Sequence, residues 1–470
     1  MARKHTKIVA TISDLNCSVE LLTELHEAGM DVVRLNTAHQ GHDDTQVVVD
    51  NVRKVSEEIA LLIDTKGPEI RSVMHEGIKE VPVTKGDTVT FTKDASVEKS
   101  LWVNYEGFIT DVPVGATILV DDGIVGMTVT GKTETSVICE IQNSGVIEKK
   151  KGINVPDVAI DLPSLTERDL GYIQYSIDQN IDFIAHSFVR NAADVLAIQE
   201  ILDEQKSDIK IISKIENRQG VDNIEEILDV SYGIMVARGD LGIEIPEEEV
   251  PIAQKIMIEA ARAKGKPVIT ATQMLHTMID NPRATRAEVS DVANSIFDGT
   301  DAIMLSGETA KGEYPVEAVQ TMTRIAVKIE EAKEDMLPGV ADENLKNPTH
   351  RFLARAAIEA CNELDAQALV AYTEHGTAAR ILSSFRGRTP IYTCMNNKRV
   401  IRELSLSYGV YPSFSEKKTD IVDYITDGIE QAKADGAVES GDNIVILTKT
   451  PGTETGSNCL EITTPENWIK

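Results

Sequence analysis

With 470 residues, of which 42% are hydrophobic and 26% charged, the chain exceeds the roughly 250 to 300 residues that one hydrophobic core accommodates, so we expect two or three domains. Its apolar residues form only short runs, which excludes a disordered chain and a membrane-spanning helix of roughly 18 apolar residues. A formal net charge of −29 disfavours nucleic acid and repels anionic metabolites, so a phosphorylated substrate would need local cations or metal ions.

The first 71 residues alternate between strand-like and helix-like segments. Strands are expected at residues 7–12, 32–36 and 61–64, with helices at residues 19–27 and 44–58. Continuous apolar runs are typical of parallel strands buried on both faces, and intervening helices are typical of βα units. Residues 1–71 therefore predict the first part of a parallel α/β domain.

The pattern changes between residues 72 and 153, where Val, Thr and Gly become frequent. Stretches such as Thr88–Phe91 and Met127–Thr130 alternate apolar and polar side chains with a period of two, which is typical of strands. Residues 72–153 therefore predict a small all-β domain inserted into the first one.

Strand and helix alternate again after the insertion. Further strands are expected at residues 183–185, 210–213, 233–237, 267–272 and 301–305. Three strands before the insertion and these five after it give the eight βα units of a (β/α)8 barrel, with residues 154–335 as its second part.

The last part of the chain predicts a separate domain. Residues 336–348 contain Pro, Gly, Asn and several charges, as is typical of a linker. Strands expected at residues 368–371, 390–394 and 443–447 are separated by helical segments. Residues 349–470 therefore predict an open α/β domain.

Polar residues stand at the carboxyl ends of six predicted barrel strands, where barrel enzymes carry their catalytic groups. Any one of them could be a structural ion pair at the barrel rim, but six strands with the same feature favour a functional site. Two carboxylates on adjacent strands suit Mg²⁺, and nearby cations suit phosphoryl transfer. The groups are Arg34-Leu35-Asn36, Asp64-Thr65-Lys66 with Arg71, Lys214-Ile215-Glu216, Arg238-Gly239-Asp240, Thr270-Ala271-Thr272 and Ser306-Gly307-Glu308.

Other motifs and the cysteines narrow the possibilities. Glycines in the stretch Ala237–Gly242 free backbone N–H groups to approach an anion. No P-loop motif and no Gly-x-Gly-x-x-Gly after a strand occurs, so neither nucleotide fold is supported. The 5 cysteines are scattered, which argues against disulfides and zinc. The opening seven residues lack the apolar segment of a signal peptide, so we expect a cytoplasmic protein.

Six stretches of the sequence resemble the pyruvate kinases, in the family's order and at its spacings over nearly the whole chain. They are Val33–Asn36, Asp64–Arg71, Ser213–Asn217, Met235–Gly242, Ile269–Leu275 and Met304–Gly312. The resemblance implies an enzyme that transfers the phosphoryl group of phosphoenolpyruvate to ADP, giving pyruvate and ATP in the last step of glycolysis.

The resemblance also implies the fold, which is α/β. We expect a TIM barrel, a small β-barrel lid inserted after the third strand, and a C-terminal open α/β regulatory domain. Because the chain ends soon after Trp468, we expect the extra phosphohistidine-like domain of some bacterial members to be absent. A homotetramer is implied as well.

The resemblance assigns catalytic roles to residues at the barrel rim. Glu216 and Asp240 would hold Mg²⁺ or Mn²⁺. Lys214 would neutralise the transferring phosphoryl group, and Arg34 would contact that group too. Thr272 would help a proton to reach the enolpyruvate carbon through a water molecule.

Binding roles follow in the same way. The substrate carboxylate would be bound by the backbone N–H groups of Gly239 and Asp240 and by the Thr272 hydroxyl. In the lid, Asp121, Asp122 and Lys150 would close over the site and exclude water. The residues expected toward the nucleotide are Asn36, His39, Arg71 and Lys150.

The first motif departs from the family pattern. The family usually reads Arg-Leu-Asn-Phe-Ser-His-Gly, whereas this chain has Thr37 and Ala38 in place of Phe and Ser. The family's Ser hydroxyl is a ligand of the monovalent cation, and Ala38 cannot supply that ligand. Asn36, Asp64 and the carbonyl group of Thr65 remain as expected K⁺ ligands.

A loop in the last domain is a candidate effector site. The strand Leu369–Tyr372 leads into the segment Thr373–Ala379 and then a helix ending near Arg386, and a helix N-terminus can bind phosphate. The alternative is that Thr377 simply caps the helix. The resemblance places the family's sugar-phosphate effector loop here, over Thr373, Glu374, Gly376 and Thr377. Because Glu374 stands where members activated by fructose bisphosphate often carry Lys, we expect a monophosphorylated sugar or a nucleotide instead.

Two alternative functions stay open. Another Mg²⁺-dependent phosphoenolpyruvate or pyruvate barrel enzyme, such as an aldolase or a mutase, would use Glu216 and Asp240 but has no use for the lid or for Arg71 near a nucleotide. A catalytically inactive metabolite sensor would need a broken catalytic set, and Lys214 and Thr272 are both present.

Overall fold

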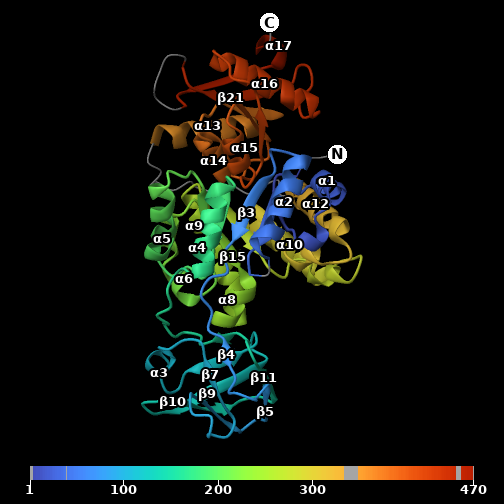
Figure 1. Cartoon of the computed structure of the whole chain (residues 1–470). Helices are drawn as coiled ribbons and strands as arrows, with labels where there is room; N and C mark the ends of the chain where they lie inside the picture. The colour runs from blue at the N-terminus through green and yellow to red at the C-terminus, as the bar shows by residue number, and fades with distance from the viewer. Residues whose placement is uncertain (1–3, 39, 333–347, 451–456, 469–470) are drawn as a thin grey trace.

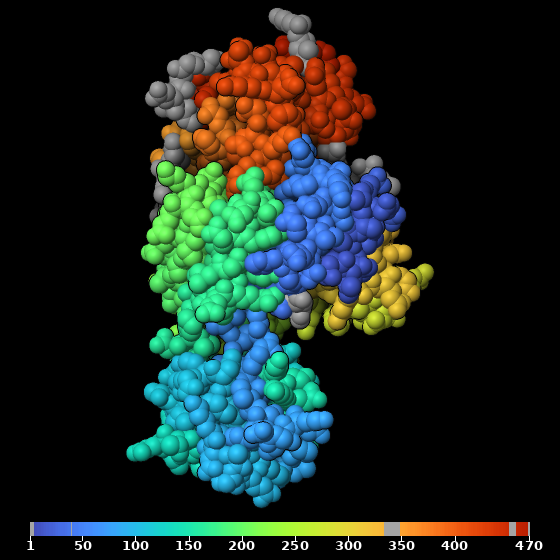
Figure 2. Space-filling view, viewed as in Figure 1, coloured from blue at the N-terminus to red at the C-terminus, as the bar shows by residue number. Residues whose placement is uncertain are grey.

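The computed structural model describes residues 4–38, 40–332, 348–450 and 457–468. Three parts follow one another along the molecule, with the C-terminal domain at one end, the barrel in the middle and the lid at the other end (Figure 1). The space-filling view shows a narrow waist between the lid and the barrel (Figure 2).

Eight strands close into a parallel barrel in the order β1-β17-β16-β15-β14-β13-β3-β2. The predicted division into three strands before the insertion and five after it is confirmed. Most strand residues are fully buried, because one face fills the barrel and the other packs under the helices. The strands are β1 (Lys7–Thr11), β2 (Val32–Asn36), β3 (Ala60–Asp64), β13 (Phe183–His186), β14 (Lys210–Ile215), β15 (Gly233–Ala237), β16 (Val268–Ala271) and β17 (Ala302–Leu305).

Helices surround the barrel, and capping residues fix where several of them begin. Thr166 and Asp169 form a capping box at the start of α4, and the carboxylate of Asp169 also accepts hydrogen bonds from the N–H groups of Lys66 and Gly67. This helix start therefore also holds the loop after β3. The barrel helices are α1 (Val19–Ala28), α2 (His42–Val55), α4 (Glu167–Asp178), α5 (Ala192–Glu204), α6 (Arg218–Asp222), α7 (Ile224–Val230), α8 (Arg238–Glu244), α9 (Val250–Ala263), α10 (Arg286–Asp298), α11 (Gly307–Ala310) and α12 (Pro315–Ala332).

The lid is all-β apart from one short helix, and it has its own apolar core, in which Phe91 and Phe108 pack with ring centroids 5.0 Å apart. Its sheets have the orders β12-β8-β9-β10-β6-β7-β4 and β11-β5. The elements are β4 (Ser72–Val73), β5 (Glu80–Val83), β6 (Thr88–Thr92), β7 (Ser100–Val103), α3 (Phe108–Asp111), β8 (Thr117–Val120), β9 (Val125–Lys132), β10 (Ser136–Ile141), β11 (Gly145–Glu148) and β12 (Ile153–Asn154).

The C-terminal domain is a five-stranded sheet with the order β20-β19-β18-β21-β22, in which β22 alone is antiparallel to its neighbour. The three predicted strands are present, and β20 and β22 were not predicted. The elements are α13 (Pro348–Glu363), β18 (Ala368–Ala371), α14 (Thr377–Ser384), β19 (Ile391–Met395), α15 (Lys398–Leu404), β20 (Val410–Phe414), α16 (Ile421–Ala434), β21 (Ile444–Thr448), β22 (Cys459–Thr463) and α17 (Pro465–Trp468).

Two buried ion pairs join the C-terminal domain to the barrel. Arg386 Nη2 lies 2.6 Å from Asp301 Oδ2, and Arg402 Nε lies 2.7 Å from Asp182 Oδ1. Asp301 and Asp182 directly precede β17 and β13, so this domain docks at the amino ends of the strands, opposite the catalytic rim.

Two further expectations concern segments of the chain. The predicted linker, residues 336–348, lies outside the described residues except for Pro348, where α13 begins. Across the described ranges, no helix combines the length and the apolar character needed to cross a membrane.

Candidate active site

A buried charged cluster lies at the carboxyl ends of β2, β3 and β14. Lys214 Nζ lies 3.1 Å from Asp64 Oδ1 and 2.9 Å from Glu216 Oε1. Arg34 Nε donates to Asp64 Oδ2 at 2.6 Å. Lys214 and Glu216 are two positions apart, so the pleat directs both side chains to the same side of the strand. The cluster therefore brings together four residues that the sequence predicted.

The pKa values in this cluster reflect burial and charge together. Burial opposes ionisation of Asp64, but Arg34 and Lys214 outweigh it and hold the pKa of that carboxyl below its usual range. Burial raises the pKa of Glu216 to about 8; Lys214 opposes this shift, while Asp240 adds to it. Burial also opposes the charge of Lys214, but the carboxylates of Asp64 and Glu216 together outweigh it and keep the pKa of the ammonium group above its ordinary value. Lys214 thus remains a cation, whereas burial favours the protonated form of Glu216 unless a further positive charge lies nearby.

Two residues of this cluster were not predicted from the sequence. Ser187 Oγ accepts from Lys214 Nζ at 2.7 Å and donates to the carbonyl group of Thr65 at 2.7 Å. The backbone N–H group of Phe188 donates to Glu216 Oε2 at 2.7 Å, which its φ of +56° makes possible. Both follow β13, so a search for polar residues directly after this strand could have found Ser187 but not the backbone contact.

Asp240, Gly239 and Thr272 lie at the ends of β15 and β16. Helix α8 begins at Arg238, so Gly239 and Asp240 are in its first turn, where N–H groups lack partners within the helix. A Cβ atom at Gly239 would stand 2.7 Å from Thr272 Cγ2, so only glycine allows this approach. The two loops therefore meet where the sequence predicted a carboxylate-binding site.

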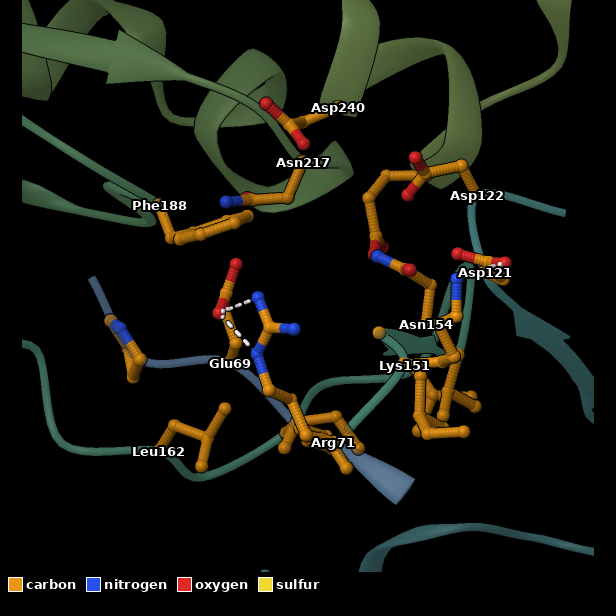
Figure 3. Close-up of a pocket in the computed structure, with 18 of the residues that line it drawn as sticks. Glu69, Arg71, Asp121, Asp122, Lys151, Asn154, Leu162, Phe188, Asn217 and Asp240 are labelled. Atoms are coloured by element: carbon orange, nitrogen blue, oxygen red, sulfur yellow. Dashed lines mark hydrogen bonds and ion pairs between the residues drawn. The ribbon is translucent and has the colours of Figure 1, made fainter. Parts of the chain in front are cut away.

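A cavity of about 530 Å³ separates the barrel from the lid. Asp240 and Asn217 face it from the barrel, and Asp121, Asp122 and Lys151 face it from the lid (Figure 3). Burial, with the charges of Asp240 and Asp121, raises the pKa of Asp122. Carboxylates from both domains thus face one space.

Two of the residues expected toward the nucleotide, Arg71 and Lys150, meet between the barrel and the lid. Arg71 pairs with Glu69, with Nη2 2.6 Å from Oε2 (Figure 3). It also donates through Nη1 to the carbonyl group of Lys150 at 2.6 Å. A second cavity of about 570 Å³ is lined by Ala38, Lys66, Arg71 and Lys150 among others. Cations from the barrel and from the lid therefore share its wall.

The expected K⁺ ligands lie close together but are occupied by protein partners. Asn36 Oδ1 accepts from the N–H group of Ala38 at 3.0 Å, and the carbonyl group of Thr65 accepts from Ser187. Asp64 is paired with Arg34 and Lys214, as described above. His39, expected toward the nucleotide, lies outside the described residues.

The donor set fits a divalent metal that also binds substrate oxygens. Glu216 Oε1 is buried and accepts no hydrogen bond of good geometry from the described residues, although Lys214 lies close to it. A nearby divalent cation would stabilise its ionised form against burial and against Asp240. In the described part of the chain, no group of three or more His, Cys, Asp or Glu side chains could hold a metal ion. Two carboxylates completed by water and substrate are the usual arrangement for Mg²⁺.

The effector loop differs in detail from its expected form. Gly376, with a φ of +74°, is the N-cap of α14. Thr377 is the first residue of this helix, so the alternative in which Thr377 caps it is wrong. Glu374 is exposed and pairs with Lys449, whose Nζ lies 2.6 Å from Oε1. Lys449 and the phenol of Tyr372 lower the pKa of Glu374. Lys449, which directly follows β21, therefore partly neutralises the negative charge of Glu374 at this loop.

Two polar residues of the predicted rim set hold the protein together instead of facing the cavity. The carboxylate of Glu308 accepts from the N–H groups of Leu275 and Ser306, which ties the loops after β16 and β17. Arg238 makes a two-pronged ion pair with Asp291 of α10, with both contacts at 2.7 Å.

Comparisons with known proteins agree on one family. The family model described as pyruvate kinase, barrel domain, matches residues 3–319, and the model described as pyruvate kinase, alpha/beta domain, matches residues 351–463. A pyruvate kinase of Borreliella burgdorferi is 49% identical, over 100% of this chain and 99% of its own length. One of Bacillus licheniformis is 45% identical, over 98% of this chain and 80% of its own length. The crystal structure of a pyruvate kinase from Cryptosporidium parvum is 35% identical and matches with a TM-score of 0.93, over 98% of this chain and 96% of that chain.

Proposed function

The chain belongs to the pyruvate kinase family, and from this premise we infer how its residues carry out the family's reaction. The protein transfers the phosphoryl group of phosphoenolpyruvate to ADP, giving pyruvate and ATP. The bond between phosphorus and the enol oxygen breaks, a bond between phosphorus and a β-phosphate oxygen of ADP forms, and the enolate then takes a proton at its methylene carbon.

Lys214 is the residue on which the phosphoryl-transfer role depends most. Its ammonium group lies between Asp64, Glu216 and Ser187, so it is held in place before substrate arrives. A fixed cation at a transferring phosphoryl group stabilises the charge that develops in the transition state without rearrangement. Arg34, held by Asp64, adds a second cation on the same side.

Mg²⁺ or Mn²⁺ held by Glu216 and Asp240 would neutralise phosphoryl and enolate oxygens. Glu216 supports this assignment because its buried Oε1 atom, although close to Lys214, accepts no hydrogen bond of good geometry from the described residues and could bind a divalent cation. The substrate carboxylate would be bound by the N–H groups of Gly239 and Asp240 at the start of α8 and by the Thr272 hydroxyl. Thr272 would then help to direct the proton to the methylene carbon through water.

The nucleotide would lie between the barrel and the lid, against Asn36, His39, Arg71 and Lys150. Arg71 can release the carbonyl group of Lys150 and turn to a phosphate, for which a guanidinium group is well suited. Movement of the lid at its waist would bring Asp121, Asp122 and Lys150 over the site and exclude water, which would otherwise hydrolyse the donor.

K⁺ would be held by Asn36, Asp64 and the carbonyl group of Thr65, with water where Ala38 lacks a hydroxyl. The hydroxyl group of Ser187 contacts Asp64, the carbonyl group of Thr65 and Lys214. The expected K⁺ ligands therefore lie beside the lysine assigned to the phosphoryl group, which supports a monovalent cation there. Such a cation would offset the repulsion between the anionic substrates.

Regulation and assembly complete the proposal. The loop with Thr373, Glu374, Gly376 and Thr377 would bind a monophosphorylated sugar or a nucleotide. The protein would act as a homotetramer in the cytoplasm. We keep the domain boundaries at residues 1–71 and 154–335 for the barrel, 72–153 for the lid, 336–348 for the linker and 349–470 for the regulatory domain.

The decisive experiment measures ADP-dependent formation of pyruvate from phosphoenolpyruvate, with Mg²⁺ and K⁺, by NADH oxidation through lactate dehydrogenase. Glu216→Gln keeps the shape of the side chain and removes one charge, so we expect kcat to fall by about 10² or more. Glu148→Gln, on the lid surface, is the matched control and should change little. Product formation that needs Mg²⁺ but not ADP would favour another phosphoenolpyruvate enzyme. Metabolite binding without turnover would favour the inactive sensor.

A further inference from the structure

Thr272 has a backbone conformation that needs support. Thr272 and Gln273 have φ values of +75° and +56°, so two consecutive residues other than glycine are left-handed. For a β-branched residue such as threonine this conformation is a true outlier. Strained residues of this kind persist where the surrounding structure holds them, and they gather at active sites.

Arg238 holds the loop that contains Thr272. Its Nη2 atom donates to the carbonyl group of Thr272 at 2.8 Å, and its Nε atom donates to the carbonyl group of Ala271 at 3.3 Å. The same Nη2 atom lies 2.8 Å from the sulfur of Met274. One guanidinium group therefore contacts the last residue of β16 and two residues of the loop after it.

Asp291 fixes the orientation of that guanidinium group. Its two carboxylate oxygens each lie 2.7 Å from one terminal nitrogen of Arg238. The Arg238 side chain is 10% exposed and the Asp291 side chain 39% exposed, so the guanidinium group is shielded from water while the carboxylate is partly open to it. A two-pronged contact fixes the plane of the guanidinium group as well as its place, which an ammonium group could not reproduce.

The opposite side of Thr272 is held by packing. The Thr272 methyl group lies against Gly239, where an added Cβ atom would stand 2.7 Å from it. Gly239 directly follows Arg238 in α8, so the two residues contact Thr272 as one unit. Thr272 therefore has no room to turn toward Gly239, and Arg238 keeps it from moving away.

We propose that Arg238, oriented by Asp291, is a positioning residue that aims the Thr272 hydroxyl at the methylene carbon of the bound enolate. This rests on the proposed role of Thr272 in the protonation step. In that step a proton joins the methylene carbon, the electron pair of the carbon–carbon double bond forms the new C–H bond, and the enolate oxygen becomes a ketone. Arg238 contributes no proton and touches no substrate.

Protonation should therefore depend on Arg238 more strongly than phosphoryl transfer does. Among the described residues, Lys214 contacts Asp64, Glu216 and Ser187, and none of these four residues forms a hydrogen bond or an ion pair with Arg238. The reverse of protonation exchanges the methyl protons of pyruvate with solvent, and it can be followed without net phosphoryl transfer. The ratio of this exchange rate to the rate of ATP formation is the quantity that the proposal predicts.

The test uses the full-length chain with Mg²⁺ and K⁺. Deuterium uptake into the pyruvate methyl group is measured by proton NMR in heavy water with ATP present, and ATP formation from phosphoenolpyruvate and ADP is measured in a single turnover. In Arg238→Lys we expect the ratio to fall about tenfold or more, since small displacements of a catalytic group have large effects on rate. Asp291→Asn should shift it in the same direction, by less, and serves if the first variant does not fold.

Two further variants separate the possible outcomes. Thr272→Val tests the proposed role itself: an unchanged ratio there would overturn that role and the inference with it. A reduced ratio in Thr272→Val with an unchanged ratio in Arg238→Lys and Asp291→Asn would overturn only the positioning role of Arg238. Arg386→Lys breaks a buried pair of the same kind with Asp301 at the far end of the barrel, so its ratio should stay constant. An equal decrease in that control would also overturn the inference.

Discussion

Replacing Lys214 with Met tests the charged cluster at the barrel rim most directly. The change removes an ammonium group that lies 2.9 Å from Glu216, 3.1 Å from Asp64 and 2.7 Å from Ser187, and it keeps most of the side-chain volume. We expect kcat to fall by about 10³, the upper part of the range for one preorganised group at a developing charge. At about 1.4 kcal/mol for each tenfold change, the activation free energy rises by about 4 kcal/mol.

The fold should survive this change. Removing one partner of a buried ion pair costs about 3–5 kcal/mol when the other partner stays charged. Here Asp64 keeps Arg34, and the pKa of Glu216 is already raised to about 8, so Glu216 can take up a proton instead of remaining an unpaired anion. We therefore expect the free energy of unfolding to fall by less than that range.

The assay combines turnover with binding. Pyruvate formation is followed through lactate dehydrogenase, and phosphoenolpyruvate binding in the presence of Mg²⁺ is followed by calorimetry, where we expect it to persist through the carboxylate site and the metal. Lys151→Met is the matched control, because Lys151 lines the cavity between the barrel and the lid but pairs with Asp121 at 2.8 Å on the lid. A Lys214→Met enzyme within tenfold of the wild-type kcat would refute the role of Lys214.

Three other outcomes are expected. Activation by K⁺ should persist but need a higher K⁺ concentration than in the variant Ala38→Ser. KCl is titrated at constant ionic strength with tetramethylammonium as the balancing cation. Equal half-activating concentrations for the unmodified protein and the variant would contradict this expectation. Fructose 1,6-bisphosphate should activate the enzyme weakly or not at all, as measured by initial rates at subsaturating phosphoenolpyruvate. The variant Glu374→Lys, which removes the acidic partner of Lys449, should respond more strongly. Strong activation of the unmodified protein would refute this expectation. Burial raises the pKa of the Cys139 and Cys361 thiols to about 12 and that of the Cys394 thiol to about 11. Iodoacetamide at about pH 8 should therefore modify the partly exposed Cys459 first, as followed by mass spectrometry. Faster labelling of Cys139, Cys361 or Cys394 would contradict this expectation.

The barrel could be predicted because its strands are short and mostly apolar, and because polar residues stand at or directly after the ends of six of them. The two missed strands lack that signal. β20 contains Pro412 and is only partly buried along most of its length, and β22 is an edge strand on which Ile462 is 47% exposed. Their positions follow from pairing with β19 and β21, which a local pattern does not reveal.

The site was predictable where function depends on side chains at strand ends. Lys214 and Glu216 are an example, because strand periodicity alone directs them to one side. The N–H group of Phe188 could not be found in this way, since its contact with Glu216 depends on a left-handed backbone angle and on a neighbouring strand. Arg238 shows the opposite case: its position at the rim suggested a binding residue, yet its contacts are with Asp291 and the loop of Thr272.

The place of the lid in the chain has a consequence for folding entropy. Leu61 lies near the start of β3, and Asp182 directly precedes the neighbouring strand β13. The backbone N–H group of Leu61 donates to the carboxylate of Asp182 at 2.9 Å, although 121 positions separate the two residues. Without residues 72–153 that separation would be about 40, and because each doubling of a loop costs about 0.6 kcal/mol, the insertion raises the cost of closing the barrel by only about 1 kcal/mol. A lid of this size can therefore be exchanged or reshaped between two paired strands with little effect on the barrel, so its sequence is free to diverge faster than the strands that carry it.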